Sequence, residues 1–258
     1  MSQRTSYTQG TPCWVDLMTT DPEAAKSFYG QLFGWTYDDV PMPQGPAYSM
    51  ATKDGVAAAI TAQPPEMAAE GVPPLWNTYL AVDDVDEVAA RVEPAGGKLL
   101  VAPFDVMDAG RMAVVTDSTG AVVGLWQARR HLGAARVNEP GTMCWNQLLT
   151  DNEYAAVAFY QRVLGLTTST MEIGGAPHTV FVSGRDPVAG ISAAPPGVPH
   201  HWHVYFAVED ASAAAQHATE LGGTVLGGPM DISIGIRVTL RDPQGGVFGI
   251  FTPKGPKP

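Results

Sequence analysis

An internal repeat limits the possible fold of this chain more than any other feature of its sequence. The pair Cys13-Trp14 recurs 131 positions later as Cys144-Trp145, and the same offset holds without a gap as far as Pro195. Further matches in this register are Leu17 with Leu148, Phe28-Tyr29 with Phe159-Tyr160, and Gly34 with Gly165. So long a register at one fixed offset is typical of the tandem duplication of one structural unit.

The repeat continues to the end of each copy with small changes of offset. Gly96 matches Gly222 at 126 positions, and Gly120 matches Gly245 at 125 positions. Two copies of this length predict two domains, because a domain usually holds about 100–200 residues. The predicted boundaries are residues 10–128 for the first domain, 129–140 for a linker and 141–253 for the second domain. Each domain divides again into two modules, namely residues 10–65, 75–128, 141–196 and 201–253.

The charge balance excludes some classes of partner. The chain has 26 acidic and 15 basic residues and a net charge of −11, whereas a nucleic-acid surface needs clustered Lys and Arg. The basic segment at residues 129–131 is interpreted as a solvated turn in the linker. No apolar run approaches the ~18 residues that span a membrane, and the N-terminus lacks an apolar signal segment. We therefore expect a cytoplasmic protein with no nucleic-acid or membrane partner.

Local signals predict the same order of elements in each module. Residues 14–18 alternate large and small side chains, as a strand does. Asp21 and Pro22 then predict a helix start, and Gly34 predicts its end, because these residues favour the N-cap, the first helical position and the left-handed C-terminal position. The following strands are expected at residues 35–37, 47–52 and 56–62. A second unit is expected to hold a strand at 78–82, a helix at 85–93 and strands at 98–101, 112–116 and 121–127. The second half repeats this pattern.

The segments that begin the modules resemble a known family. The pattern Leu17-x-Thr-x-Asp21 leads to Phe28-Tyr29-x-x-Leu32-Phe-Gly34, and a copy follows 131 residues later. Four such modules in order, over roughly residues 12–252, resemble the vicinal oxygen chelate superfamily of glyoxalases, bleomycin-resistance proteins and extradiol dioxygenases. Its tandem two-domain actinobacterial members are especially similar. The resemblance implies an α+β fold in which four βαβββ modules pair into two glyoxalase-like domains. Each domain would be a curled mixed sheet around a cavity, with the helices outside.

The resemblance also implies where metal ligands would lie, namely a His on the first strand and a Glu on the last strand of a module. The corresponding positions here hold Trp14, Asn77, Gly124, Trp145, His203 and Gly249. One imidazole without a carboxylate falls short of the ligands that a metal site needs. The segment His200-His201-x-His203 is interpreted as a strand entry with chance histidines. We therefore predict no metal and no other cofactor, and a metal-dependent lyase or dioxygenase is the least favoured function.

Aromatic side chains are expected to occupy the cavities instead. The predicted ligand-binding residues are Trp14, Asn77, Tyr79 and Trp126 in the first half and Trp145, Gln147, Tyr205 and Phe251 in the second. Trp and Tyr with a few polar groups are typical of a site for a flat, partly aromatic small molecule. The alternative is that these aromatic side chains simply fill the interior of each barrel.

Two side chains are candidate catalytic residues. His203 could act as a general base, because the pKa of histidine lies near neutral pH. Asp16 could act as an acid or base if burial raised its pKa. Neither belongs to a visible catalytic triad, so the sequence does not assign an enzyme.

Three hypotheses about function stay open. The first is a metal-independent protein that binds a small aromatic or natural-product-like molecule. The second is a cofactor-independent hydroxylase, isomerase or cyclase on such a substrate, and the third is a non-catalytic scaffold. A monomer or weak homodimer is expected, because four modules in one chain can satisfy all pairings internally.

Overall fold

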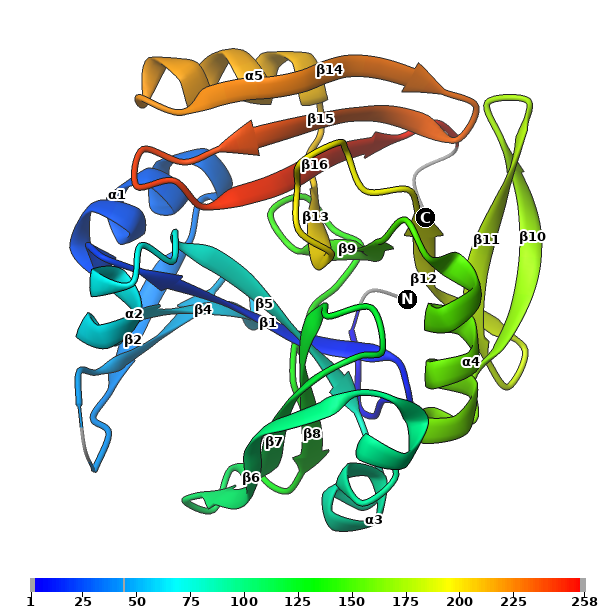
Figure 1. Cartoon of the computed structure of the whole chain (residues 1–258). Helices are drawn as coiled ribbons and strands as arrows, with labels where there is room; N and C mark the ends of the chain where they lie inside the picture. The colour runs from blue at the N-terminus through cyan, green and yellow to red at the C-terminus, as the bar shows by residue number, and fades with distance from the viewer. Residues whose placement is uncertain (1–2, 44, 256–258) are drawn as a thin grey trace.

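The computed structural model describes residues 3–43 and 45–255, which form two eight-stranded sheets, one from each copy of the repeat (Figure 1). The first sheet contains β1 (Pro12–Thr19), β2 (Thr36–Val40), β3 (Tyr48–Thr52), β4 (Val56–Ala62), β5 (Leu75–Ala81), β6 (Lys98–Val106), β7 (Gly110–Thr116) and β8 (Val122–Ala128). The second contains β9 (Met143–Leu149), β10 (Thr167–Ile173), β11 (Ala176–Ser183), β12 (Asp186–Ser192), β13 (His201–Ala207), β14 (Thr224–Ile232), β15 (Gly235–Arg241) and β16 (Val247–Pro253). These curled mixed sheets confirm the predicted α+β fold.

The helices are α1 (Pro22–Phe33), α2 (Pro65–Ala69), α3 (Val85–Ala89), the 3-10 helix η1 (Glu93–Ala95), α4 (Glu153–Leu164) and α5 (Ala211–Glu220). In α1 the Asp21 carboxylate accepts from the amide of Ala24, and Gly34 ends the helix in the left-handed conformation, as predicted. Within residues 3–43 and 45–255, none of these helices has both the length and the apolar character to cross a membrane.

Two differences from the expected elements have local causes. The helix expected at residues 85–93 ends at Ala89 and continues as tight turns into η1. Pro94 explains this, because proline has no backbone N–H to bond the carbonyl of Ala90, and its ring clashes with that carbonyl in an α-helix. The short helix α2 lies between the two predicted modules of the first half, where no element was expected, and Pro65 stands at its start.

Both sheets have the same strand order, which joins the two modules of each half edge to edge. The orders are β2-β3-β4-β1-β5-β8-β7-β6 and β10-β11-β12-β9-β13-β16-β15-β14. In the antiparallel central pairs, Trp14 lies opposite Tyr79 and Trp145 lies opposite Tyr205. Since side chains alternate between faces along a strand, this register places the predicted cavity residues of each half on one face.

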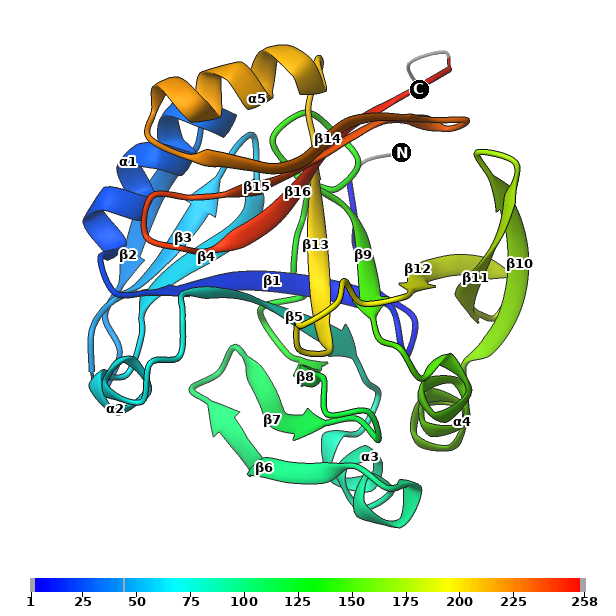
Figure 2. The ribbon, with the colours of Figure 1, turned by 45° about the horizontal axis from the view of Figure 1, so that its top comes forward.

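The opposite faces of the sheets carry the helices, and there the two halves pack against each other. Helix α1 of the first half packs against α5, and α4 of the second half packs against α3 (Figure 2). The Tyr29 hydroxyl on α1 donates to Asp242 of the second half at 2.8 Å, and the Tyr160 hydroxyl on α4 donates to Asp117 of the first at 3.0 Å. Both hydrophobic cores therefore contain side chains from both halves.

Candidate functional site

A buried carboxylate organises the inner face of the first sheet. Asp16 is 3 % exposed, and its Oδ2 accepts from the hydroxyls of Tyr48 and Tyr79, each at 2.8 Å. Its Oδ1 accepts from the Asn77 amide at 2.8 Å, and the Trp14 indole N–H donates to the Tyr48 hydroxyl at 2.8 Å. Burial raises the pKa of Asp16, and the three hydrogen bonds oppose this rise because they stabilise the charged form. Four side chains thus interlock around the Asp16 carboxylate.

A histidine from the linker closes this inner face. The His131 ring packs edge-on against Trp14, with a centroid distance of 4.5 Å, and lies 5.7 Å from the ring of Trp126. The Trp126 indole N–H donates to the His131 carbonyl at 2.9 Å. Burial lowers the pKa of His131 to about 4, and the two tryptophans are only 4 % and 6 % exposed. The interpretation of residues 129–131 as a solvated turn is therefore wrong for His131, although the two arginines before it are exposed.

The inner face of the second sheet instead encloses a cavity of about 670 Å³. Its wall includes four of the predicted ligand-binding residues, Trp145, Gln147, Tyr205 and Phe251. Other wall residues are Met171, Ile173, His178, Val180, Met230, Ile234 and Arg237. The wall is thus mostly apolar and aromatic, with a few polar groups from separate strands.

The contrast between the halves follows from a few replacements on the same face. Register places His178 and Val180 on β11 where Tyr48 and Met50 lie on β3, because Val180 pairs with Gly190 as Met50 pairs with Ala59. Equivalent residues of β3 and β11 are therefore 130 positions apart in the sequence, rather than 131.

The side chains on the inner face of the second half are less connected by hydrogen bonds than those of the first. Gln147 replaces the central Asp16, and its amide donates to the Ser192 hydroxyl. Trp145 is only half-buried, and no residue in the described part of the chain accepts a hydrogen bond from its indole N–H. The side chains that tie Trp14 in place thus have no equivalents around Trp145.

Comparison with known proteins identifies the family. The glyoxalase/bleomycin resistance protein/dioxygenase superfamily matches residues 12–125, and a glyoxalase-like domain matches residues 143–251. The chain is 55 % identical over 257 residues to "Putative glyoxylase CFP32" of Mycobacterium tuberculosis, covering 98 % of both chains. The chain belongs to this superfamily.

Other matches agree with this assignment. The chain is 37 % identical to "Anthracycline biosynthesis protein DnrV" of Streptomyces peucetius, with 95 % of this chain and 94 % of the relative covered. Among solved structures, the Mn(II)-bound glyoxalase from Novosphingobium aromaticivorans superposes with a TM-score of 0.64 at 17 % identity. That match covers 95 % of this chain and 83 % of the other, and it shows a shared fold.

The residues at the metal-ligand positions of the superfamily do not fit a metal ion. A Cβ atom added to Gly124 would lie 2.2 Å from Cδ1 of Tyr79, and one added to Gly249 would lie 2.2 Å from Cδ1 of Tyr205. In each half a tyrosine ring therefore occupies the space into which a glutamate ligand would extend. Within the described ranges, no group of three or more His, Cys, Asp or Glu is arranged to hold a metal.

The three neighbouring histidines point to separate partners. His200 donates from Nδ1 to the Thr119 carbonyl at 2.7 Å and pairs through Nε2 with Asp151 at 2.8 Å, and His201 donates from Nδ1 to the Pro199 carbonyl at 2.8 Å. His203 is 3 % exposed, and its Nε2 has no hydrogen-bond partner in the structure. Burial, and then the charges of His201 and Arg237, lower its pKa to about 3. The His203 imidazole is therefore neutral at physiological pH.

The structure divides the predicted site residues into two groups. Trp14, Asp16, Asn77, Tyr79 and Trp126 form the closed network of the first half. Those of the second half surround the cavity, except that His203 is not among the described wall residues and instead stacks edge-on against Tyr205 at 4.8 Å. The roles proposed for all of these residues stay predictions.

Sequence reasoning missed His131, His178 and Arg237. Arg237 could have been found by comparing the copies, because the offset of 125 places it opposite Met112. His178 could not, because the one-residue shift within β11 hides its equivalence to Tyr48. Nothing in the sequence around His131 indicated that its ring would enter the inner face.

Proposed function

We propose that this protein binds a small molecule with a flat aromatic ring system in the cavity of its second half, without a metal ion. The cavity itself carries the proposal. Its volume of about 670 Å³ lies in the range of sites for drug-sized ligands, about 300–1,000 Å³. The half-buried Trp145 and the rings of Tyr205 and Phe251 offer stacking area, which is how proteins hold planar ligands.

Two further observations support this proposal. The name of the relative DnrV refers to anthracycline biosynthesis, which favours a natural-product-like aromatic ligand for this chain as well. The tyrosine rings packed on Gly124 and Gly249 favour a metal-independent mode of binding.

The proposal can be tested with 1,8-dihydroxyanthraquinone as a planar probe, titrated in the presence of EDTA while tryptophan fluorescence is recorded. We expect saturable quenching, and Trp145→Phe should remove most of it, because Trp14 and Trp126 are closed off from solvent. His178→Trp should fill the cavity and weaken binding by at least tenfold. Thr170→Trp is the matched control, since this residue lies on the neighbouring strand β10 and is exposed. Quenching that is unchanged by both Trp145→Phe and His178→Trp would contradict the proposal.

A second candidate is a cofactor-independent hydroxylase, isomerase or cyclase that uses the same cavity. The observation that favours it is the buried, unpartnered Nε2 of His203 beside the wall residue Tyr205. Its test is metal-free turnover of small molecules that co-purify with the protein, followed by mass spectrometry. Turnover that His203→Gln abolishes would favour an enzyme, whereas binding without any product would favour a binding protein.

A further inference from the structure

The cavity wall contains one cation, Arg237, that has no anionic partner. Arg237 lies on β15 in register with Phe251, so its side chain shares the inner face with Phe251 and Tyr205. Arg237 is half-buried, and its Nη2 donates to the sulfur of Met230 at 3.3 Å. A thioether is a weak acceptor. Arg237 also interacts with the Tyr205 hydroxyl, where it opposes the rise that burial causes in the pKa of that tyrosine. Asp231, the acid on the same wall, instead pairs with Lys254 and has a side chain that is 68 % exposed. Across residues 3–43 and 45–255, no carboxylate forms an ion pair with Arg237.

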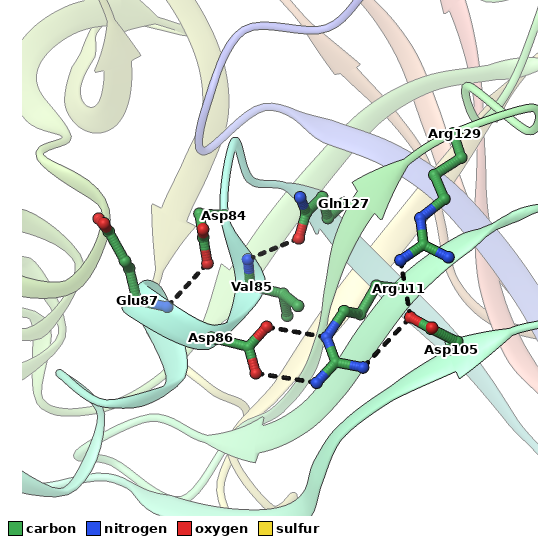
Figure 3. Close-up of polar contacts among 8 residues, drawn as sticks. All are labelled: Asp84, Val85, Asp86, Glu87, Asp105, Arg111, Gln127 and Arg129. Carbon is green, nitrogen blue, oxygen red and sulfur yellow. Dashed lines mark hydrogen bonds and ion pairs between the residues drawn. The ribbon is translucent and has the colours of Figure 1, made fainter.

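The contrast with Arg111 shows what a satisfied arginine looks like in this fold. Arg111 lies on β7, the counterpart of β15, one position before the equivalent of Arg237. Its Nε and Nη2 donate to Asp86 at 2.8 and 2.9 Å, and its Nη1 donates to Asp105 at 3.2 Å (Figure 3). Asp105 also accepts from Arg129 at 2.9 Å. The first half therefore pairs its arginines at the surface, and it has Met112 on the inner face where the second half has Arg237.

Two other polar groups without protein partners accompany Arg237. The Trp145 indole N–H has no acceptor in the described part of the chain, and His203 keeps a buried Nε2 without a partner. Arg237 is close enough to His203 that its charge contributes to the low pKa of that imidazole. A partly buried guanidinium without an anionic partner is unfavourable, since the neutral groups of Met230 and Tyr205 replace its lost interaction with water only in part. A ligand that supplies an acceptor would remove this cost.

We propose that the molecule bound in this cavity carries a carboxylate, which Arg237 holds while the aromatic rings lie against Trp145 and Phe251. This inference rests on the proposed function of the same cavity. A carboxylate matches the planar guanidinium with two parallel hydrogen bonds, and such charge-assisted bonds are stronger than neutral ones. The net charge of −11 does not attract anions from a distance. Recognition therefore depends on Arg237 locally.

Two matched probes test this inference, anthraquinone-2-carboxylate and anthraquinone-2-carboxamide, which share rings but differ in charge. We expect the wild-type protein to bind the carboxylate at least tenfold more tightly in calorimetric titrations. Arg237→Gln should remove this preference and leave the carboxamide within twofold of its wild-type affinity. Arg237→Lys should keep part of the preference, because it keeps the charge but loses the planar fork. Arg111→Gln is the control and should change neither affinity.

The outcomes separate the two proposals. Equal affinities for the two probes in the wild type, or a preference that survives in Arg237→Gln, would overturn the role of Arg237 and leave the ring-binding cavity intact. If neither probe bound, or if His178→Trp weakened neither, the proposed function itself would fail. Thermal unfolding of each variant verifies that an altered affinity does not reflect a loss of folded protein.

Discussion

The two halves of this protein share one fold but use their inner faces differently. In the first half, Tyr48, Tyr79 and Asn77 donate hydrogen bonds to Asp16, and Trp14 donates to Tyr48. In the second half, Gln147 stands in the place of Asp16 and the face encloses a cavity. A polar group whose hydrogen bonds are all made within the protein offers few contacts to a ligand. Unpaired donors on an open wall, in contrast, favour ligand binding.

This difference shows how a duplication can separate stability from binding. The first copy holds its inner face closed with a hydrogen-bond network, and both copies share their hydrophobic cores through the helices. The second copy can therefore contain a cavity, because the hydrophobic cores that it shares with the first copy contribute to its stability. Four predictions about stability test how far the two inner faces differ.

The largest effect is expected for Asp16→Ala. Removing this carboxylate leaves three partly buried donors without an acceptor, and a fully buried unsatisfied group costs about 1–3 kcal/mol. We expect the free energy of unfolding, measured by urea denaturation, to fall by about 4 kcal/mol. Gln147→Ala, the equivalent change in the second half, should cost about 1 kcal/mol, because Gln147 lies on a cavity wall. Asp38→Ala at the exposed edge is the control. Similar losses for Asp16 and Gln147 would contradict the contrast between the halves.

The next effect concerns the glycines beneath the tyrosine rings. Gly124→Ala should push the Tyr79 ring away and break its hydrogen bond to Asp16, at a cost of about 3 kcal/mol. Gly249→Ala should cost less, about 1.5 kcal/mol, because the Tyr205 ring can move into the neighbouring cavity. Gly227→Ala, which adds a methyl group in open space, should be nearly neutral. A larger loss of stability for Gly249→Ala than for Gly124→Ala would contradict the contrast between the two inner faces.

A third effect depends on pH. The pKa of His203 falls from 6.5 to about 3 on folding, so the unfolded chain binds the proton more tightly. Stability from the neutral imidazole is complete above pH 6.5 and declines as the pH falls toward 3. Between pH 6.5 and 5 the loss in the free energy of unfolding amounts to about 2 kcal/mol, at 1.36 kcal/mol per pH unit. His203→Gln should flatten the dependence by that amount, and the exposed His217→Gln should not alter it. His131, with a pKa of about 4, should contribute in the same direction but less, because it is partly exposed.

The sequence predicted the fold well because its signals are local and repeated. Asp21, Pro22 and Gly34 mark a helix through backbone preferences that act over a few residues, and four ordered copies exclude most other arrangements. The open or closed state of each inner face is a different kind of property. It depends on His131 arriving from the linker and on Tyr48 reaching Asp16 across the sheet, and both depend on contacts that no local pattern encodes.

The smallest expected effect concerns the strand position where the halves diverge. Tyr48→Phe removes a hydroxyl that both donates to Asp16 and accepts from Trp14, so it leaves one donor and one acceptor less satisfied. We expect a loss of about 1.5 kcal/mol in the free energy of unfolding. His178→Phe at the equivalent place on β11 should stay within about 0.5 kcal/mol of the wild type, since no described residue forms a polar contact with this imidazole. If His178→Phe were the more destabilising change, the second wall would contain a hydrogen bond as important as those around Asp16. The second inner face would then be held by its own polar network, and its openness could no longer be attributed to the absence of one.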